Sequence, residues 1–372
     1  MPSRYLESVV LGENRGVISW LLRALLWPLS LLYRVGLWAF LEVYRLGVRK
    51  RCHLEAPVIS VGNLTFGGTG KTPAVQAICR GLTEQGKRVV VLSRGHGGCA
   101  RDVLVVSDGE RMLADSGEAG DEPVLLARTL PGVAVVVGRD RRESGRLACE
   151  RFAPDVIVLD DGMQYWQLHR DLDIVVIDAR KPFGSGFVMP MGDLREPASG
   201  LKRAGVILLT NSRSVVGADR TALENRLAKL APGAVAFRCS HMPLCLRNAG
   251  TGEPVGLQWA RRRTILAFCG IGKPLAFLDM LDGLGAVVAR SIVFPDHYRL
   301  SEADIRRIID EASACGAEAI VTTEKDIARL GDSVSIPNLH ALVIRLEIED
   351  SASFAEHITN RIDCQDQPAS RP

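Results

Sequence analysis

A glycine-rich loop followed by a lysine and a hydroxyl residue is the clearest chemical signal in this sequence. Residues 63–73 (NLTFGGTGKTP) follow an apolar run at 57–62 and precede a predicted helix at about 72–85. Glycines let backbone N–H groups turn onto an anion, the lysine reaches the β- and γ-phosphates of a nucleotide, and the hydroxyl ligates Mg²⁺ at the helix N-terminus. Thr65 stands where the usual motif has its first glycine, but strand, loop and helix occur in the right order. The pattern predicts nucleotide binding by Gly67, Gly68, Thr69, Gly70, Lys71 and Thr72.

Two consecutive carboxylates follow another apolar run. The segment 156–161 (VIVLDD) ends in Asp160 and Asp161, and Gly162 comes next. Proteins with a phosphate-binding loop place an acid at the end of a neighbouring parallel strand, where it holds Mg²⁺ directly or through water. We therefore expect one of the two aspartates in the metal system, and the sequence does not distinguish between them.

A third acidic signal opens a predicted helix at 120–123 (GDEP). Asp121 has two interpretations, because aspartate is a common helix cap and is also a natural base for a hydroxyl proton. The local sequence favours the cap, whereas transfer of a group to a hydroxyl would require the base. Five further charged residues are candidates for clamping phosphate or ordering the site: Arg139, Arg141, Arg142, Arg195 and Glu196.

Short β-branched runs alternate with helical stretches in the body of the chain. They include 88–93, 133–138, 173–178 and 206–210. Such runs predict a parallel sheet covered on both faces, so the fold class is α/β. We expect a phosphate-binding-loop lobe at 52–240, a linker at 241–262 and a smaller α/β lobe at 263–372 with a frayed tail. A glycine turn at 269–274 (CGIGKP) lacks the hydroxyl residue and is interpreted as a simple turn between strand and helix.

The N-terminal segment 1–51 forms its own region and contains three of the five tryptophans. Arg23, Arg34 and Arg45 align on one stripe of a helix, and the tryptophans form a second line beside it. The longest uncharged run falls short of the ~20 residues that a membrane-spanning helix needs. We predict an amphipathic helix in the membrane interface; the alternative is a terminal hairpin packed on the protein's own core. Pro28 is expected to kink this segment or split it into two helices.

Composition excludes several classes of protein. The 372 residues are 47% hydrophobic and 24% charged, which suits a folded chain of two domains. Net charge is only +3, and residues 1–55 carry eight Lys+Arg against four Asp+Glu, so the basic excess is N-terminal and no nucleic-acid partner is expected. The nine cysteines are scattered and form no Cys-x-x-Cys pair, which predicts reduced thiols in a cytosolic body.

Eight motifs in order resemble the tetraacyldisaccharide 4′-kinases, the lipid A 4′-kinases of Gram-negative bacteria. They are NLTFGGTGKTP (63–73), LSRGHGG (92–98), GDEP (120–123), VGRDR (137–141), LDDGMQ (159–164), LREP (194–197), FPDH (294–297) and TTEKD (322–326). The resemblance implies transfer of the ATP γ-phosphate to the 4′-hydroxyl of a tetraacylated glucosamine disaccharide 1-phosphate, with ATP and Mg²⁺ as cofactors. It also implies a peripheral enzyme at the cytoplasmic face of the bacterial inner membrane, and no obligate protein partner is expected.

The resemblance also assigns roles to residues. Asp121 is implied as the catalytic base, His297 is similar to the histidine that supports it, and Lys71 with Thr72 takes the phosphate-loop roles. Asp160 or Asp161 would belong to the Mg²⁺ system. Around substrate or nucleotide it places Arg94, Arg141, Gln164, Arg195 and Glu196.

Four residues depart from the family pattern, and none carries an assigned role. His96 stands for a tyrosine, Met163 for a phenylalanine, Tyr165 for a histidine and Asp193 for a proline. The alternative function is a deviant-Walker ATPase that cycles on and off membranes. Such switches carry a lysine at the first loop position, where this chain has Phe66.

Overall fold

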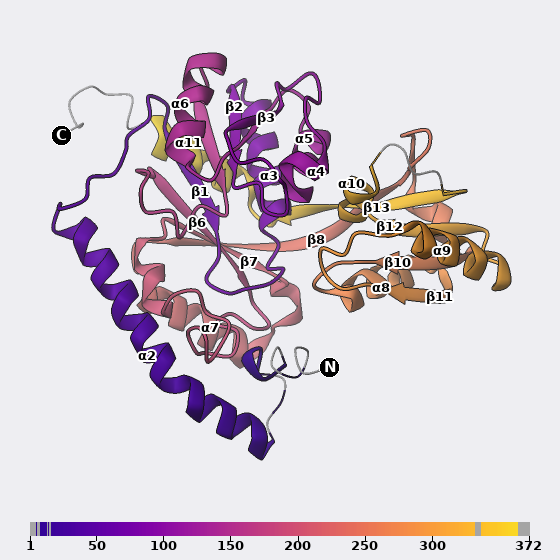
Figure 1. Cartoon of the computed structure of the whole chain (residues 1–372), viewed down its shortest axis with the longest axis horizontal. Helices are drawn as coiled ribbons and strands as arrows, with labels where there is room; N and C mark the ends of the chain where they lie inside the picture. The colour runs from indigo at the N-terminus through magenta and orange to yellow at the C-terminus, as the bar shows by residue number, and fades with distance from the viewer. Residues whose placement is uncertain (1–4, 6–7, 13, 15, 332–335, 364–372) are drawn as a thin grey trace. The chain divides into compact units, whose positions relative to one another are not determined.

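The computed structural model describes residues 5, 8–12, 14, 16–331 and 336–363 (Figure 1). They divide into two compact units, each built from separate stretches of chain. Unit 1 comprises residues 1–75, 145–240 and 348–372, and unit 2 comprises residues 76–144 and 241–347. The predicted boundaries of contiguous lobes stay a prediction, and the expected frayed tail lies outside the described residues.

Unit 1 is built on a parallel sheet in the order β8-β7-β6-β1-β5. Its strands are buried along almost their whole length because apolar side chains point to both faces, as the near-continuous runs predict. Its elements are α2 (Val17–Arg45), β1 (Val58–Gly62), β5 (Val156–Asp160), β6 (Leu172–Asp178), the 3₁₀ turns η1 (Ala198–Arg203) and η2 (Ser212–Ser214), β7 (Val206–Thr210), α7 (Gly217–Leu230) and α11 (Ser351–Asp363).

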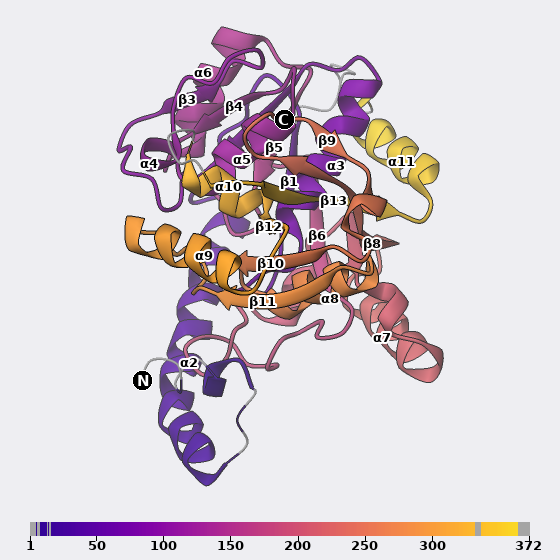
Figure 2. The same cartoon turned by 90° about the vertical axis from the view of Figure 1, so that its right-hand side faces the viewer.

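Unit 2 has two groups of strands. In one, β2 pairs with β4 in parallel and β4 pairs with β3 antiparallel. In the other, β11, β10, β12 and β13 lie side by side and parallel, with α8 packed on one face and α9 on the other (Figure 2). Its elements are β2 (Val89–Ser93), β3 (Leu104–Ser107), α4 (Ser116–Ala119), α5 (Asp121–Thr129), β4 (Ala134–Val137), β9 (Pro254–Val255), η3 (Leu257–Ala260), β10 (Thr264–Cys269), α8 (Pro274–Gly283), β11 (Val287–Val293), α9 (Glu302–Ala314), β12 (Ala319–Thr323), α10 (Glu324–Leu330) and β13 (Leu339–Ile348).

Four elements contain residues of both units: α3 (Lys71–Glu84), α6 (Arg141–Phe152), β8 (Val235–Asn248) and β13, whose last residue, Ile348, belongs to unit 1. The predicted α/β class with parallel strands is confirmed. Strand β3 was not among the predicted strands, although residues 103–106 (VLVV) form a short apolar run like the others. It pairs antiparallel at the end of its group. The segment predicted as a linker begins inside β8, which continues to Asn248.

Helix α2 is continuous from Val17 to Arg45 with Pro28 inside it, so of the two expected effects of Pro28, a kink or a split into two helices, the split does not occur (Figure 1). The first half of its polar line faces the protein, because Ser30 Oγ donates to the Val188 carbonyl oxygen at 2.8 Å and Arg23 Nη2 donates to the Val9 carbonyl oxygen at 2.8 Å. Arg34 and Arg45, further along the same line, are exposed. Trp20, Trp27 and Trp38 are 68%, 57% and 61% exposed. The helix therefore presents its apolar side outward, the reverse of an ordinary surface helix.

By length and composition α2 is able to cross a membrane, since its most apolar 18-residue window has a mean hydropathy of 1.5. This corrects the expectation that the segment is too short to span a membrane, because that expectation considered only the longest run without a charged residue. Only 6% of that window is buried, so the alternative of a hairpin packed on the protein's core is also wrong.

Candidate active site

The phosphate-binding loop of unit 1 links the end of β1 to the start of α3. Gly67 and Gly70 have φ of 98° and 97°, a conformation that side-chain-bearing residues rarely adopt. Gly62 is required for another reason, because a Cβ there would lie 2.4 Å from Cβ of Met163. Met163, a departure from the family pattern, is thus a packing residue behind the loop.

Asn63 organises this loop from inside, and the sequence analysis missed it. Its buried Nδ2 donates to the Thr65 carbonyl oxygen at 2.7 Å and to Thr69 Oγ1 at 2.9 Å. Its Oδ1 accepts from Lys71 Nζ at 3.1 Å. One side chain therefore ties together both ends of the loop and holds the lysine that the motif provides.

Asn63→Ala is expected to raise the KM for ATP about tenfold or more, because loss of a buried hydrogen-bonding group costs about 1–3 kcal/mol and here would loosen the loop and its lysine. Initial rates against ATP concentration measure it. Asn225→Ala, which removes an exposed asparagine of α7, is the control. An unchanged KM in a folded Asn63 variant would remove Asn63 from the nucleotide site.

A cluster of charged side chains lies beside the loop lysine. Asp161 Oδ1 is 3.8 Å from Lys71 Nζ, and Arg195 Nη1 donates to both Asp161 oxygens at 2.8 and 2.7 Å. The Arg195 guanidinium also lies 4.9 Å from the ring centre of Phe66, within the loop. Asp160 is buried at the end of β5, and Asp161 follows it with φ of 54°. The structure thus brings together the predicted residues Lys71, Asp161 and Arg195.

Gln164 and Glu196 form a supporting layer under this cluster. Gln164 Nε2 donates to the Asn63 carbonyl oxygen at 3.0 Å and to Glu196 Oε1 at 2.8 Å. Arg203 donates to both Glu196 oxygens at 2.7 and 2.6 Å, which satisfies that buried carboxylate. Gln164 therefore contacts the loop backbone, and Glu196 holds Gln164 from the side away from it.

The donor set near the loop suits a hard cation. Thr72, Asp160 and Asp161 offer hydroxyl and carboxylate oxygens, the ligands that Mg²⁺ prefers. Within the described part of the chain, no group of three or more His, Cys, Asp or Glu side chains forms a metal cluster of its own. A cation here would therefore be held jointly with phosphate oxygens, as is usual for Mg²⁺.

Asp121 lies in unit 2 as the first residue of α5, and it does not cap that helix. The N-cap is Gly120, and no side chain caps the helix. Asp121 Oδ2 instead accepts a hydrogen bond from Arg329 Nε at 2.7 Å and lies 3.4 Å from His297 Nδ1. The geometry removes the cap interpretation that the local sequence favoured.

Electrostatics keep this carboxylate ionised. Burial by itself would raise the pKa of Asp121, but hydrogen bonds from His297 and Arg329 lower that pKa below its ordinary value. The hydrogen bond to Asp121 in turn raises the pKa of His297. The pair thus favours a negative aspartate beside a histidine that holds its proton more firmly than usual.

The remaining predicted or departing residues have mostly structural contacts. His96 lies edge-on to the His297 ring, with centroids 6.0 Å apart, and so occupies a place beside the proposed site. The Tyr165 hydroxyl donates to Gln167 Oε1 at 3.3 Å. The buried Asp193 accepts a hydrogen bond from the Ser185 backbone N–H at 2.7 Å. Arg141 is buried with Nη1 3.4 Å from the Arg139 carbonyl oxygen, and Arg94 is exposed.

Comparison with known proteins identifies the family. The model of the family described as tetraacyldisaccharide-1-P 4′-kinase matches residues 22–363. The chain belongs to this family.

Individual relatives agree along most of the chain. A tetraacyldisaccharide 4′-kinase of Anaeromyxobacter sp. (strain K) is 42% identical over 313 residues, which cover 82% of this chain and 81% of that protein. One of Pelobacter propionicus is 39% identical, covering 96% and 97%. A solved structure of LpxK from Aquifex aeolicus in complex with ATP has a TM-score of 0.74 at 32% identity, covering 92% of this chain and 99% of that one.

These findings confirm the predicted family, the kinase class and the use of ATP with Mg²⁺. The alternative of a membrane-cycling ATPase switch is not favoured.

Proposed function

We propose that this chain transfers the γ-phosphate of ATP to the 4′-hydroxyl of a tetraacylated glucosamine disaccharide 1-phosphate, a step of lipid A biosynthesis. Family membership supports the reaction and the substrate class. Within the chain, the observation that carries the proposal is the direction of the Asp121 carboxylate. It opens a helix, yet it contacts a histidine and an arginine instead of the helix backbone.

In this reaction the loop and Lys71 bind the phosphates, and Arg195 adds positive charge beside them. Mg²⁺, held by Thr72 and by Asp160 or Asp161, would neutralise phosphate charge when bound. Asp121 accepts the proton of the 4′-hydroxyl while that oxygen bonds to the γ-phosphorus, and ADP leaves with the electrons of the broken phosphorus–oxygen bond. His297 supports Asp121 in the required orientation. Because the transition state of phosphoryl transfer is loose, the chain contributes mainly position and charge.

The direct test is transfer of label from γ-labelled ATP to the acylated disaccharide 1-phosphate in detergent. We expect a labelled lipid whose formation requires both Mg²⁺ and the 4′-hydroxyl. The disaccharide lacking that hydroxyl is the matched control. Hydrolysis of ATP at the same rate with and without the lipid, and no labelled lipid, would contradict the proposal.

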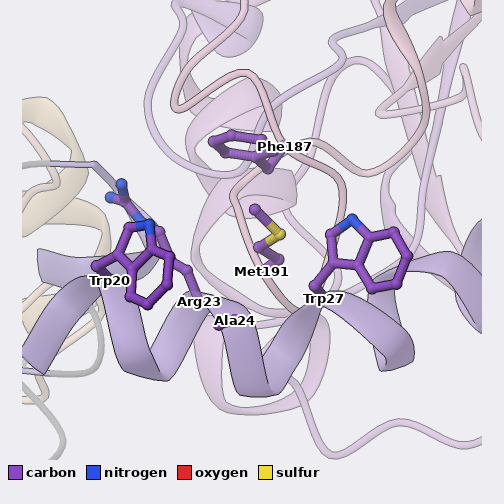
Figure 3. A pocket seen from close by; sticks show the side chains of 6 residues that line it. All are labelled: Trp20, Arg23, Ala24, Trp27, Phe187 and Met191. Atoms are coloured by element: carbon purple, nitrogen blue, oxygen red, sulfur yellow. The ribbon is translucent and has the colours of Figure 1, made fainter.

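We also propose that α2 lies in the cytoplasmic face of the inner membrane with its exposed apolar side in the lipid. The support is the outward row of indoles, since tryptophan suits the boundary between headgroups and acyl chains. Figure 3 shows the side chains of Phe187 and Met191 above α2, between Trp20 and Trp27. These residues line an open pocket of about 410 Å³, which continues the apolar surface of the helix.

Replacing Trp20, Trp27 and Trp38 together with serine should weaken binding to phospholipid vesicles about 10²-fold, if each exposed indole contributes about 1 kcal/mol or more. Vesicle co-sedimentation measures this, and kcat on a detergent-dispersed substrate should stay near wild type. Leu275→Ser, which removes an apolar side chain that is 73% exposed on α8, is the control. Vesicle binding equal to wild type in the triple variant would show that the indoles do not contact lipid.

A further inference from the structure

Arg329 is a buried arginine of α10 that contacts acceptors from three parts of unit 2. Its side chain is 4% exposed. Its Nε donates to Asp121 Oδ2 at 2.7 Å, and its Nη1 donates to Asp326 Oδ1 at 3.1 Å and to the Gly270 carbonyl oxygen. A guanidinium holds its donors in one rigid plane, so fixing two of its nitrogens also fixes the direction of the third.

The acceptors that hold Arg329 are themselves fixed. Asp326 Oδ2 accepts from Thr322 Oγ1 at 3.1 Å and from Thr323 Oγ1 at 2.6 Å, and its Oδ1 accepts from the Gly270 backbone N–H at 3.0 Å. The TTEKD segment at 322–326 and the glycine turn after β10 thus form one frame around the arginine. The proposed chemistry gives neither motif a role. Their contacts give both the role of holding Arg329 in place.

We infer that Arg329 is a positioning residue for Asp121, which it holds by one oxygen so that the other faces the substrate hydroxyl. This inference rests on the proposed role of Asp121 as the base. Both contacts to the carboxylate are made through Oδ2, and among the described residues none donates a hydrogen bond to Oδ1. A carboxylate that is held at Oδ2 presents Oδ1 in one fixed direction, and Oδ1 is then the oxygen that accepts the proton.

Arginine is better suited than histidine to this holding role. His297 is the more loosely placed partner, since its side chain is 45% exposed and its ring nitrogen is 3.4 Å from the carboxylate. Arg329 is nearly buried and lies closer, with its Nε 2.7 Å from Asp121 Oδ2. The histidine is thus the adjustable contact and the arginine the fixed one.

The charges around Asp121 decide how its titration responds to Arg329. Arg329 and His297 face it directly, Asp296 Oδ1 lies 3.6 Å from Arg329 Nη2, and Lys325 pairs with Glu122 at 2.8 Å. His96 lies beyond the His297 ring. Arg329 lowers the pKa of Asp121, whereas burial raises it. Loss of Arg329 should therefore raise the pKa of Asp121. The acidic limb of kcat against pH should then move to higher pH.

The first test is Arg329→Gln, assayed as phosphate transfer across a range of pH. Because misplacing a reacting group by about 1 Å costs about 10²-fold, we expect kcat to fall by about that factor. We also expect the acidic limb to move upward and the KM for ATP to stay within a few-fold. A merely structural role would lower the folded fraction and leave the position of that limb unchanged.

A second variant, Arg329→Lys, separates charge from geometry. Lysine keeps the positive charge but lacks the planar set of donors. We expect an acidic limb close to wild type with kcat lowered about tenfold, because the carboxylate is ionised but less firmly oriented. If Arg329→Gln does not fold, Arg329→Lys still tests the inference, because it keeps a cation beside the buried carboxylates.

Arg307→Gln is the matched control, because it removes an exposed arginine that pairs with Glu311 at 2.8 Å on α9. Its kcat and pH profile should match wild type. Normal kcat and an unmoved acidic limb in both Arg329 variants would overturn the inference. In that case an impaired Asp121→Asn variant in the same assay would leave the proposed function standing without the role of Arg329. Failure of the wild-type chain to transfer phosphate would instead contradict the proposed function itself.

Discussion

Lys71→Ala is expected to lower turnover by about 10³-fold or more, because charge stabilisation is most of what a protein supplies to phosphoryl transfer. Lys71 follows the loop glycine Gly70 at the start of α3, and its ammonium group lies between Asn63 and Asp161. Alanine removes the cation while the loop backbone keeps its hydrogen bonds through Asn63 to Thr65 and Thr69. The measurement is kcat at saturating ATP and lipid.

Lys229→Ala, an exposed lysine of α7, controls for loss of a positive charge in unit 1. Thermal melting shows whether each variant is folded. Turnover within a few-fold of wild type in a folded Lys71 variant would mean that the loop does not bind the transferred phosphate.

Asp121→Asn should lower turnover by about 10²–10⁴-fold, because asparagine keeps the size of the side chain but cannot take the proton. A capping role predicts the opposite result, since asparagine and aspartate cap helices about equally well. ATP affinity should stay within a few-fold. The kinetic constants and the melting temperature of this variant are compared with those of Glu122→Gln, which alters the neighbouring acid on α5.

His297→Ala should also slow turnover, and the double variant with Asp121→Asn should be much less impaired than the product of the two single effects. Residues that act as one unit are strongly non-additive, since removing either partner already loses the function of both. Strictly multiplicative losses would show that the two residues act separately. Turnover like wild type in Asp121→Asn would end the assignment of that residue as the base.

The local parts of the site were predictable because they depend on neighbours in sequence. A strand, a glycine loop and a helix that begins with a lysine require only short-range geometry, and the structure has them at β1, residues 63–70 and α3. The acids at the end of β5 follow in the same way, because they come directly after a short apolar run that is bounded by a glycine. The expectation that Asp160 or Asp161 lies near the loop used the rule that proteins with a phosphate-binding loop place an acid at the end of a neighbouring parallel strand.

The exposed side of α2 shows where periodicity stops being sufficient. Spacing placed the arginines on one stripe and the tryptophans on another, and both lines exist. Periodicity does not say which line faces the protein. That was decided by contacts of Ser30 and Arg23 with backbone carbonyl oxygens, which turned the first half of the polar line inward and left the indoles outside.

The sequence alone determined the family, the α/β class and the phosphate-binding loop, because each is carried by residues adjacent in the chain or by motifs in a fixed order. Only the tertiary structure decided which side chains Asp121 contacts. Its partners lie 176 and 208 positions away, and local spacing predicts nothing about hydrogen bonds closed over such distances. Arg329 carried no signal for the same reason: its function depends on three acceptors that come together only when unit 2 folds.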